Sequence, residues 1–157
     1  MHRHEEKSTL DRAVVRLASQ FHENWRANRI QENGLFLSDI EATTDELWIA
    51  ENGTDQVDIA NRAFDALPSD WQKENLAAAE VAQGLLNQGL SSEVDVTSDE
   101  FIEGASSSIH DAWLERNKLE AGGVLDVPYE KLPEEEKARD RAQILTAVEF
   151  HLHPGEV

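Results

Sequence analysis

One set of polar and aromatic residues in the first half of the sequence has the types and spacing of a ligand site. Asp58 and Asn61 share one face of an expected helix, and Trp71 and Asn75 lie one turn apart on another. Such groups could recognise a planar ligand by stacking on the indole ring and by hydrogen bonds to the two amides. The alternative is a buried polar network that fastens this segment to the rest of the protein.

A second candidate lies at the end of the first expected helix. Arg26 and Arg29 follow Trp25 directly, in a chain that has few basic residues. Two guanidinium groups at this spacing could clamp an anionic ligand, such as a phosphate or a carboxylate. They could equally form surface ion pairs with nearby acids, which usually contribute little to stability.

Two histidines occupy matching positions, each three residues before a tryptophan. His22 precedes Trp25, and His110 precedes Trp113. The functional interpretation is a hydrogen-bonding histidine in a ligand pocket, which Trp113 and Tyr129 would line in the second half. The alternative is a structural histidine satisfied by a carboxylate or a backbone group. The recurrence favours a shared structural role, such as fixing the loop that follows.

The sequence contains no catalytic constellation. It has no cysteine, no Gly-x-Ser-x-Gly and no phosphate-cradling glycine loop. His2-x-His4 and His151-x-His153 are short pairs near the ends, without a further ligand fixed nearby. We therefore expect no enzymatic activity, no metal site and no cofactor.

Composition restricts the partners further. The 157 residues include 14 Lys and Arg against 32 Asp and Glu, a formal net charge of -18. Such a chain lacks the cations that bind a nucleic-acid backbone or an anionic membrane. No apolar stretch reaches the length of a membrane span, and the first residues are charged rather than apolar. We expect a cytoplasmic protein.

Apolar periodicity, capping residues and prolines predict a succession of helices. The expected helices are 8–28, a short helix after a Thr43–Glu46 capping box and ending at Asn52-Gly53, 57–66, 70–87 after a Ser69–Gln72 box, one from a Thr97–Glu100 box past Trp113, and Pro133 to about His151. Residues 89–97 are expected to form a linker.

The two halves of the sequence share two motifs in the same order. Residues 18–29 and 106–117 both contain His-acidic-x-Trp, and residues 64–70 and 129–135 both contain aromatic-acidic-x-Leu-Pro. Two ordered matches at helix boundaries favour a duplication. We therefore predict an all-α fold: two helix–loop–helix units related by a pseudo-twofold and packed as one compact bundle. The first unit (8–88) contains a long insertion, the second spans 97–152, and 1–7 and 153–157 are tails.

The second copy resembles the ryanodine-receptor (RyR) domain family. The resemblance lies in the His-x-x-Trp helix around His110, in Val127-Pro128-Tyr129-x-x-Leu132, and in the acidic helix start that ends in Lys-x-x-Asp140-Arg141. It covers about the last third of the chain, and the first copy is a weaker echo. The Gly-Trp-x-Tyr-Gly segment of the family is missing, as is the His-Pro before the turn.

The resemblance implies helical repeats that act as ligand- or partner-binding modules and not as catalysts. Our expectation is a non-catalytic module for a small anionic or nucleotide-like ligand or for a protein segment. The alternative is an acidic interaction protein that binds a basic partner. Direct binding to nucleic acid or to a membrane is not expected.

Overall fold

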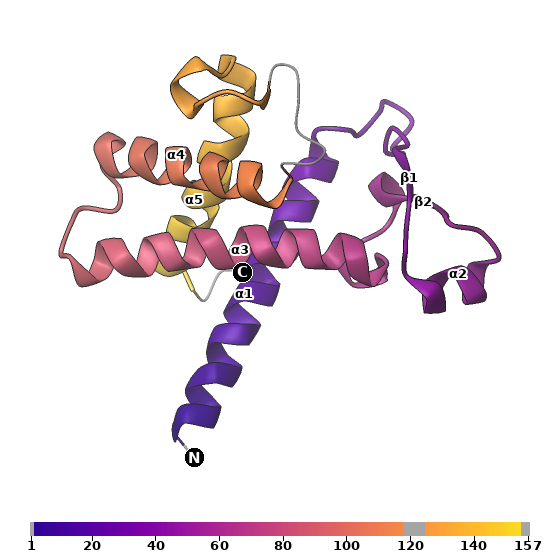
Figure 1. The fold of residues 1–157 in the computed structure, drawn as a ribbon, viewed down its shortest axis with the longest axis horizontal. Helices are drawn as coiled ribbons and strands as arrows, with labels where there is room; N and C mark the ends of the chain where they lie inside the picture. The colour runs from indigo at the N-terminus through magenta and orange to yellow at the C-terminus, as the bar shows by residue number, and fades with distance from the viewer. Residues whose placement is uncertain (1, 118–124, 155–157) are drawn as a thin grey trace. The chain divides into compact units, whose positions relative to one another are not determined.

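The described part of the chain is all-α apart from one short sheet, in agreement with the predicted fold class. The computed structural model describes residues 2–117 and 125–154, with side chains from residue 12 onward. Its α-helices are α1 (His2–Ala27), α2 (Glu46–Asn52), α3 (Ser69–Ser91), α4 (Asp99–Arg116) and α5 (Glu134–Leu152) (Figure 1). The 3₁₀ turns η1 (Ile59–Asn61), η2 (Phe64–Ala66) and η4 (Tyr129–Lys131) lie between them.

The chain divides into two compact units, unit 1 (Met1–Ala77) and unit 2 (Ala78–Val157), each described by itself below. The division falls inside α3, whereas the sequence suggested a boundary at the linker 89–97. That linker is shorter than expected, because α3 continues to Ser91 and α4 begins at Asp99. At the other end, α1 begins at His2 and not at Ser8 or Thr9, since the preceding Glu and Lys residues are good helix formers.

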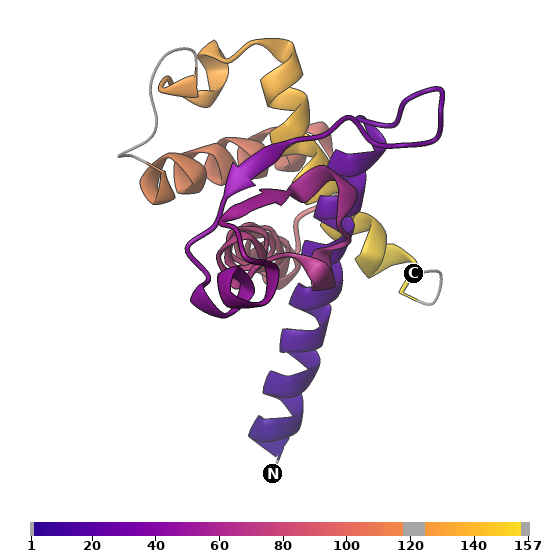
Figure 2. The same ribbon diagram turned by 90° about the vertical axis from the view of Figure 1, so that its right-hand side faces the viewer.

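In unit 1, a long connection joins the end of α1 to η2, which packs against α1. The connection holds α2 and an antiparallel pair of strands, β1 (Ile40–Ala42) and β2 (Gln56–Asp58), in register Glu41 to Val57 (Figure 2). The large buried apolar side chains of this unit are Leu17, Phe21, Trp48, Val57, Ile59, Phe64 and Leu67. The insertion therefore shares the core of α1 and is not a separate body.

In unit 2, α4 packs against both α5 and η4. Its buried apolar side chains include Leu86, Ile102, Ile109, Tyr129, Leu132, Ile144 and Val148. Burial of roughly seven large side chains, each stabilising by about 1.5–3 kcal/mol, is the main force that holds these elements together.

The predicted helix over residues 57–66 is wrong. Val57 pairs with Glu41 in the sheet, and the Asp58 carboxylate then accepts the Ala60 N–H and begins a 3₁₀ turn. Strand pairing with a segment far away in the sequence overrides the local helical pattern here.

Three predicted helix caps are displaced by one or two residues. Ser69, the predicted cap of α3, is already the first residue of that helix, and the Pro68 carbonyl accepts the Gln72 N–H. Asp45, not Thr43, caps α2 by accepting the Trp48 N–H at 3.2 Å. Ser98, not Thr97, caps α4. The predicted stop at Gly53 is confirmed, because this residue ends α2 at φ +71°, where glycine has no steric penalty.

Two helical glycines of unit 2 should respond oppositely to alanine. A Cβ on Gly89 would lie 2.6 Å from Cε1 of Phe101 and 3.0 Å from Cγ1 of Val96, whereas a Cβ on Gly84 meets nothing within 4 Å. We expect Gly89→Ala to destabilise the protein by about 1–2 kcal/mol through overpacking. Gly84→Ala is expected to stabilise it by roughly 0.5–1 kcal/mol through helix propensity. Urea unfolding of both variants checks this; equal effects would contradict the packing at Gly89.

Candidate functional site

His22 joins α1 to the segment that precedes η2 in unit 1. The side chain is 4% exposed, and its Nε2 lies 2.7 Å from the carbonyl oxygen of Arg62. A carbonyl can only accept, so Nε2 carries a proton. The imidazole stacks on Trp25 with ring centroids 5.8 Å apart. Burial lowers the pKa of His22, although the backbone hydrogen bond to Arg62 acts in the opposite direction. The neutral imidazole thus joins α1 to the segment before η2.

His110 makes the same contact in unit 2. It is 3% exposed, its Nε2 donates to the carbonyl of Val127 at 2.7 Å, and its ring stacks on Trp113 at 6.2 Å. Its second nitrogen, Nδ1, lies 3.7 Å from Oδ2 of Asp140 on α5. His110 therefore holds both the turn before η4 and a buried acid.

The two sequence motifs are the two sides of one tertiary contact. In each unit the accepting carbonyl belongs to the residue two positions before the aromatic of the 3₁₀ turn, Arg62 before Phe64 and Val127 before Tyr129. Both aromatics are buried. This is the contact expected of a shared structural role for the histidines, and it supports the duplication.

Asp140 distinguishes the second copy from the first, which has Asn75 at the aligned position. The Asp140 side chain is only 14% exposed. Burial raises the pKa of Asp140 to about 6, with a further increase from Glu136, while His110 acts to lower it.

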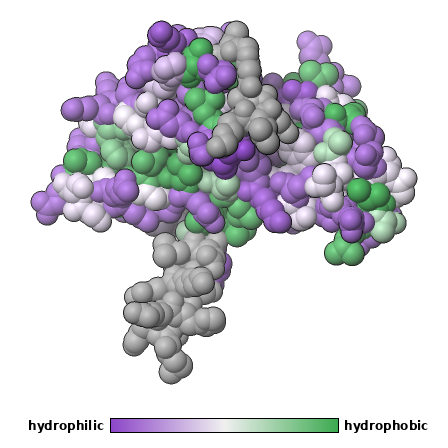
Figure 3. Space-filling model, viewed as in Figure 1, coloured by the Kyte–Doolittle hydropathy of each residue, from purple (hydrophilic) through white to green (hydrophobic). Residues whose placement is uncertain are grey.

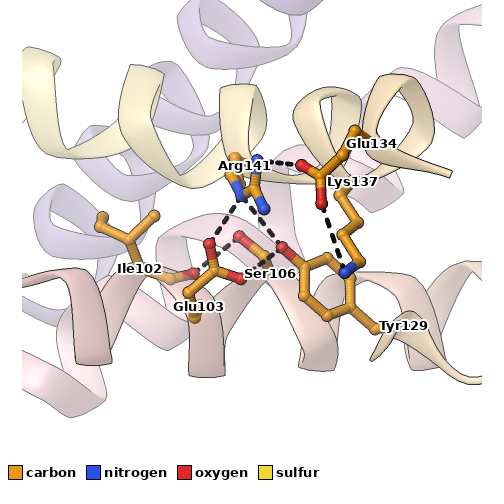
Figure 4. Close-up of polar contacts among 7 residues, drawn as sticks. All are labelled: Ile102, Glu103, Ser106, Tyr129, Glu134, Lys137 and Arg141. Carbon is orange, nitrogen blue, oxygen red and sulfur yellow. Dashed lines mark hydrogen bonds and ion pairs between the residues drawn. The ribbon is translucent and has the colours of Figure 1, made fainter. Parts of the chain in front are cut away.

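Tyr129 is the centre of a second difference between the copies (Figure 4). Its hydroxyl donates to Glu103 at 2.6 Å, and Arg141 Nε bridges that carboxylate at 2.7 Å and the hydroxyl oxygen at 3.1 Å. Burial and the Glu103 hydrogen bond raise the pKa of Tyr129. The hydrogen bond from Tyr129 lowers the pKa of Glu103, although burial opposes it. The first copy has Phe64 in place of Tyr129 and cannot make this network.

Arg26 and Arg29, the candidate anion clamp, bond to the protein's own backbone. Arg26 Nε donates to the carbonyl of Ala60 at 2.9 Å, and its guanidinium lies over the Phe36 ring at 4.3 Å. Arg29 donates to the carbonyls of Leu37 and Ser38 at 2.9 and 3.0 Å. Both groups fasten the loop after α1.

The polar set of the first half separates into two pairs that also bond within the chain. Asn61 donates to Asp58 at 2.7 Å and to the carbonyl of Phe36 at 3.2 Å. Burial raises the pKa of Asp58, but hydrogen bonds led by the one from Asn61 outweigh it and lower the pKa below its usual value. Trp71 Nε1 bonds elsewhere, to the carbonyl of Ala42 at 3.1 Å, and Asn75 donates to the carbonyl of Trp71. These are the contacts of a fastening network.

The connection between α1 and η2 exposes several large apolar side chains, which sequence patterns did not predict. Among the described residues, ten large apolar side chains are exposed, and half of them lie between Ile30 and Leu47. They are Ile30, Leu35, Leu37, Ile40 and Leu47. Figure 3 shows apolar side chains in green among polar ones in purple over the part that Figure 1 labels α2, β1 and β2.

The described side chains form no metal-binding cluster: nowhere in residues 12–117 and 125–154 do three His, Asp or Glu side chains meet as a metal site would require. The side chains of His2 and His4 lie outside the described part. None of the described helices combines the length and apolar character of a membrane span. No family model, curated protein or solved structure matches the chain.

Proposed function

We propose that this chain is a non-catalytic, cytoplasmic binding module built from two RyR-like helical units, and that it binds a segment of another protein. One observation supports the proposal. In the connection between α1 and η2, polar side chains bond to the backbone of the same chain, whereas large apolar side chains are exposed. Scattered exposed apolar residues are common, but a concentration of them is typical of interaction surfaces.

The small-ligand version has less support. An anion clamp needs free guanidinium groups, and those of Arg26 and Arg29 already donate to backbone carbonyls. The indole N–H of Trp71, which could orient a planar ligand, already donates to the carbonyl of Ala42. Breaking such bonds to admit a ligand would cost about 1 kcal/mol or more each.

The acidic composition favours a basic partner, which unites the two functions expected from the sequence. The net charge of -18 raises the rate of encounter with cationic partners and repels anionic ones. It also predicts that binding weakens as salt is added.

Two ligand panels, measured by thermal unfolding and by fluorescence anisotropy, test this proposal. Nucleotides and small anionic metabolites are expected to leave the melting temperature unchanged, whereas a subset of labelled 15-residue peptides containing Lys, Arg and Leu is expected to bind saturably. A ligand at 100 times its Kd stabilises the folded protein by about 2.7 kcal/mol, so binding of a nucleotide or of a peptide would be easily measured. Stabilisation by a nucleotide without any peptide binding would overturn the proposal.

A further inference from the structure

The hairpin arm, residues 29–38, is a tight turn that projects from the end of α1. Its backbone closes on itself: Gln31 N–H bonds to the Leu35 carbonyl at 2.8 Å, and Leu37 N–H bonds to the Arg29 carbonyl at 2.7 Å. Gly34 turns the chain at φ +83°, a conformation that favours glycine. The arm is thus a defined structure although it buries little apolar surface.

Three side chains, two of them from outside the arm, hold the arm in place. The guanidinium of Arg26 covers the Phe36 ring, and Asn61 bonds to the Phe36 carbonyl. Arg29 holds the far end at Leu37 and Ser38. Two of the chain's 14 basic residues are therefore used to order an exposed loop. Ordering a loop before binding lowers the entropy that association must overcome.

The arm presents leucines to solvent on the side away from Arg26. Successive side chains of an extended segment alternate, so Leu35 and Leu37 point opposite to Phe36. They are 62% and 54% exposed, and Leu47, on α2, is 78% exposed. A monomer gains nothing from holding such side chains rigidly in water.

The charge around these leucines identifies the occupant. Residues 29–62 contain eight Asp and Glu against two Arg. Both guanidinium groups are engaged within the chain, Arg29 with the carbonyls of Leu37 and Ser38 and Arg62 over the Trp48 ring. A second copy of this chain would bring like charges together, which opposes self-association. Nucleic acid and anionic membranes are repelled for the same reason. A cationic protein segment with apolar side chains satisfies both features.

We infer that the hairpin arm forms a docking surface for a segment of another protein that combines Lys or Arg with apolar side chains. This inference rests on the proposed function and adds the place of binding and the chemistry of the partner. Leu35 and Leu37 supply the apolar contacts. The surrounding carboxylates select cations, and Arg26 and Arg29 are positioning residues.

The test uses the full chain and designed 15-residue peptides, each with three Leu and four Lys, and a matched set in which Glu replaces Lys. At least one Lys peptide is expected to bind, and no Glu peptide. The double variant Leu35→Gln, Leu37→Gln should weaken binding by roughly tenfold or more, as expected for loss of central apolar contacts. Leu145→Gln is the matched control, because Leu145 is also half exposed (48%) but lies on α5, and its affinity should change less than about twofold.

A third variant separates positioning from contact. Arg29→Ala keeps both leucines but removes the side-chain bonds to the carbonyls of Leu37 and Ser38. Binding should therefore weaken by roughly threefold to tenfold, and hydrogen exchange at the Leu37 N–H should accelerate. If Lys peptides bind with equal affinity to the Leu35, Leu37 double variant, the docking surface is wrong although the proposed function stands. If no peptide binds, the proposed function fails as well. Concentration-dependent dimers that the double variant abolishes would overturn the cationic partner in favour of a second copy.

Discussion

Replacing His110 with alanine is expected to lower the free energy of unfolding by about 3 kcal/mol, the combined result of an emptied buried site and an unsatisfied carbonyl. The imidazole is 3% exposed and donates to the Val127 carbonyl, which then has no partner. The nearby Asp140 also loses the group that favours its charged form. Urea unfolding followed by tryptophan fluorescence measures the change.

Three further variants make the His110 result specific. His22→Ala should cost about 2 kcal/mol, less than His110→Ala, because the acid next to His22, Glu23, is 41% exposed and pairs with Arg26, whereas Asp140 is buried. His110→Gln keeps an N–H that can reach the Val127 carbonyl and should restore part of the loss. His151→Ala, at an exposed position of α5, should change stability by less than about 0.5 kcal/mol. Equal effects of all three alanine variants would contradict the role of the histidines as clamps.

Asp140→Asn is expected to stabilise the protein at neutral pH, and to do so less as the pH falls. The pKa of Asp140 is raised to about 6 in the folded state, from its ordinary value of 3.8. Native Asp140 therefore binds a proton more tightly than unfolded Asp140, and its contribution to stability falls as the pH rises from 3.8 to 6. Above pH 6 the buried charge costs roughly 3 kcal/mol, about 1.4 kcal/mol for each pKa unit, and asparagine removes that cost.

Unfolding at pH 7.5 and at pH 5 measures this effect. The advantage of the asparagine variant should be about 1.4 kcal/mol larger at pH 7.5 than at pH 5. Asp111→Asn removes one exposed acid from the same unit and serves as the control for net charge. His22 contributes a slope of opposite sign, since its lowered pKa makes stability fall as the pH drops below 6.5, but this slope is common to all three proteins. A pH profile of Asp140→Asn parallel to that of the wild type would show that Asp140 titrates normally.

The features that the sequence by itself determined are those governed by neighbouring residues. Helical periodicity located α1, α3, α4 and α5, Pro133 marked the start of α5, and Gly53 marked the end of α2. Each depends on backbone preferences or on contacts within one turn of helix. The two repeated sequence motifs also pointed to the histidine–carbonyl contacts, because each half contains both sides of such a contact.

Only the tertiary structure decided the features that depend on distant partners. Residues 57–66 had a helical pattern, yet pairing with β1 made Val57 part of a strand. Arg26, Arg29 and Asn61 had the types of a ligand site, yet each donates to a backbone carbonyl that lies eight or more residues away. Residue type and spacing show which kinds of group a side chain could bond, whereas the fold determines which backbone carbonyl lies within hydrogen-bond distance of it. The exposure of Leu35 and Leu37 also depends on the fold, because Phe36 packs under the guanidinium of Arg26 and the two leucines point the other way.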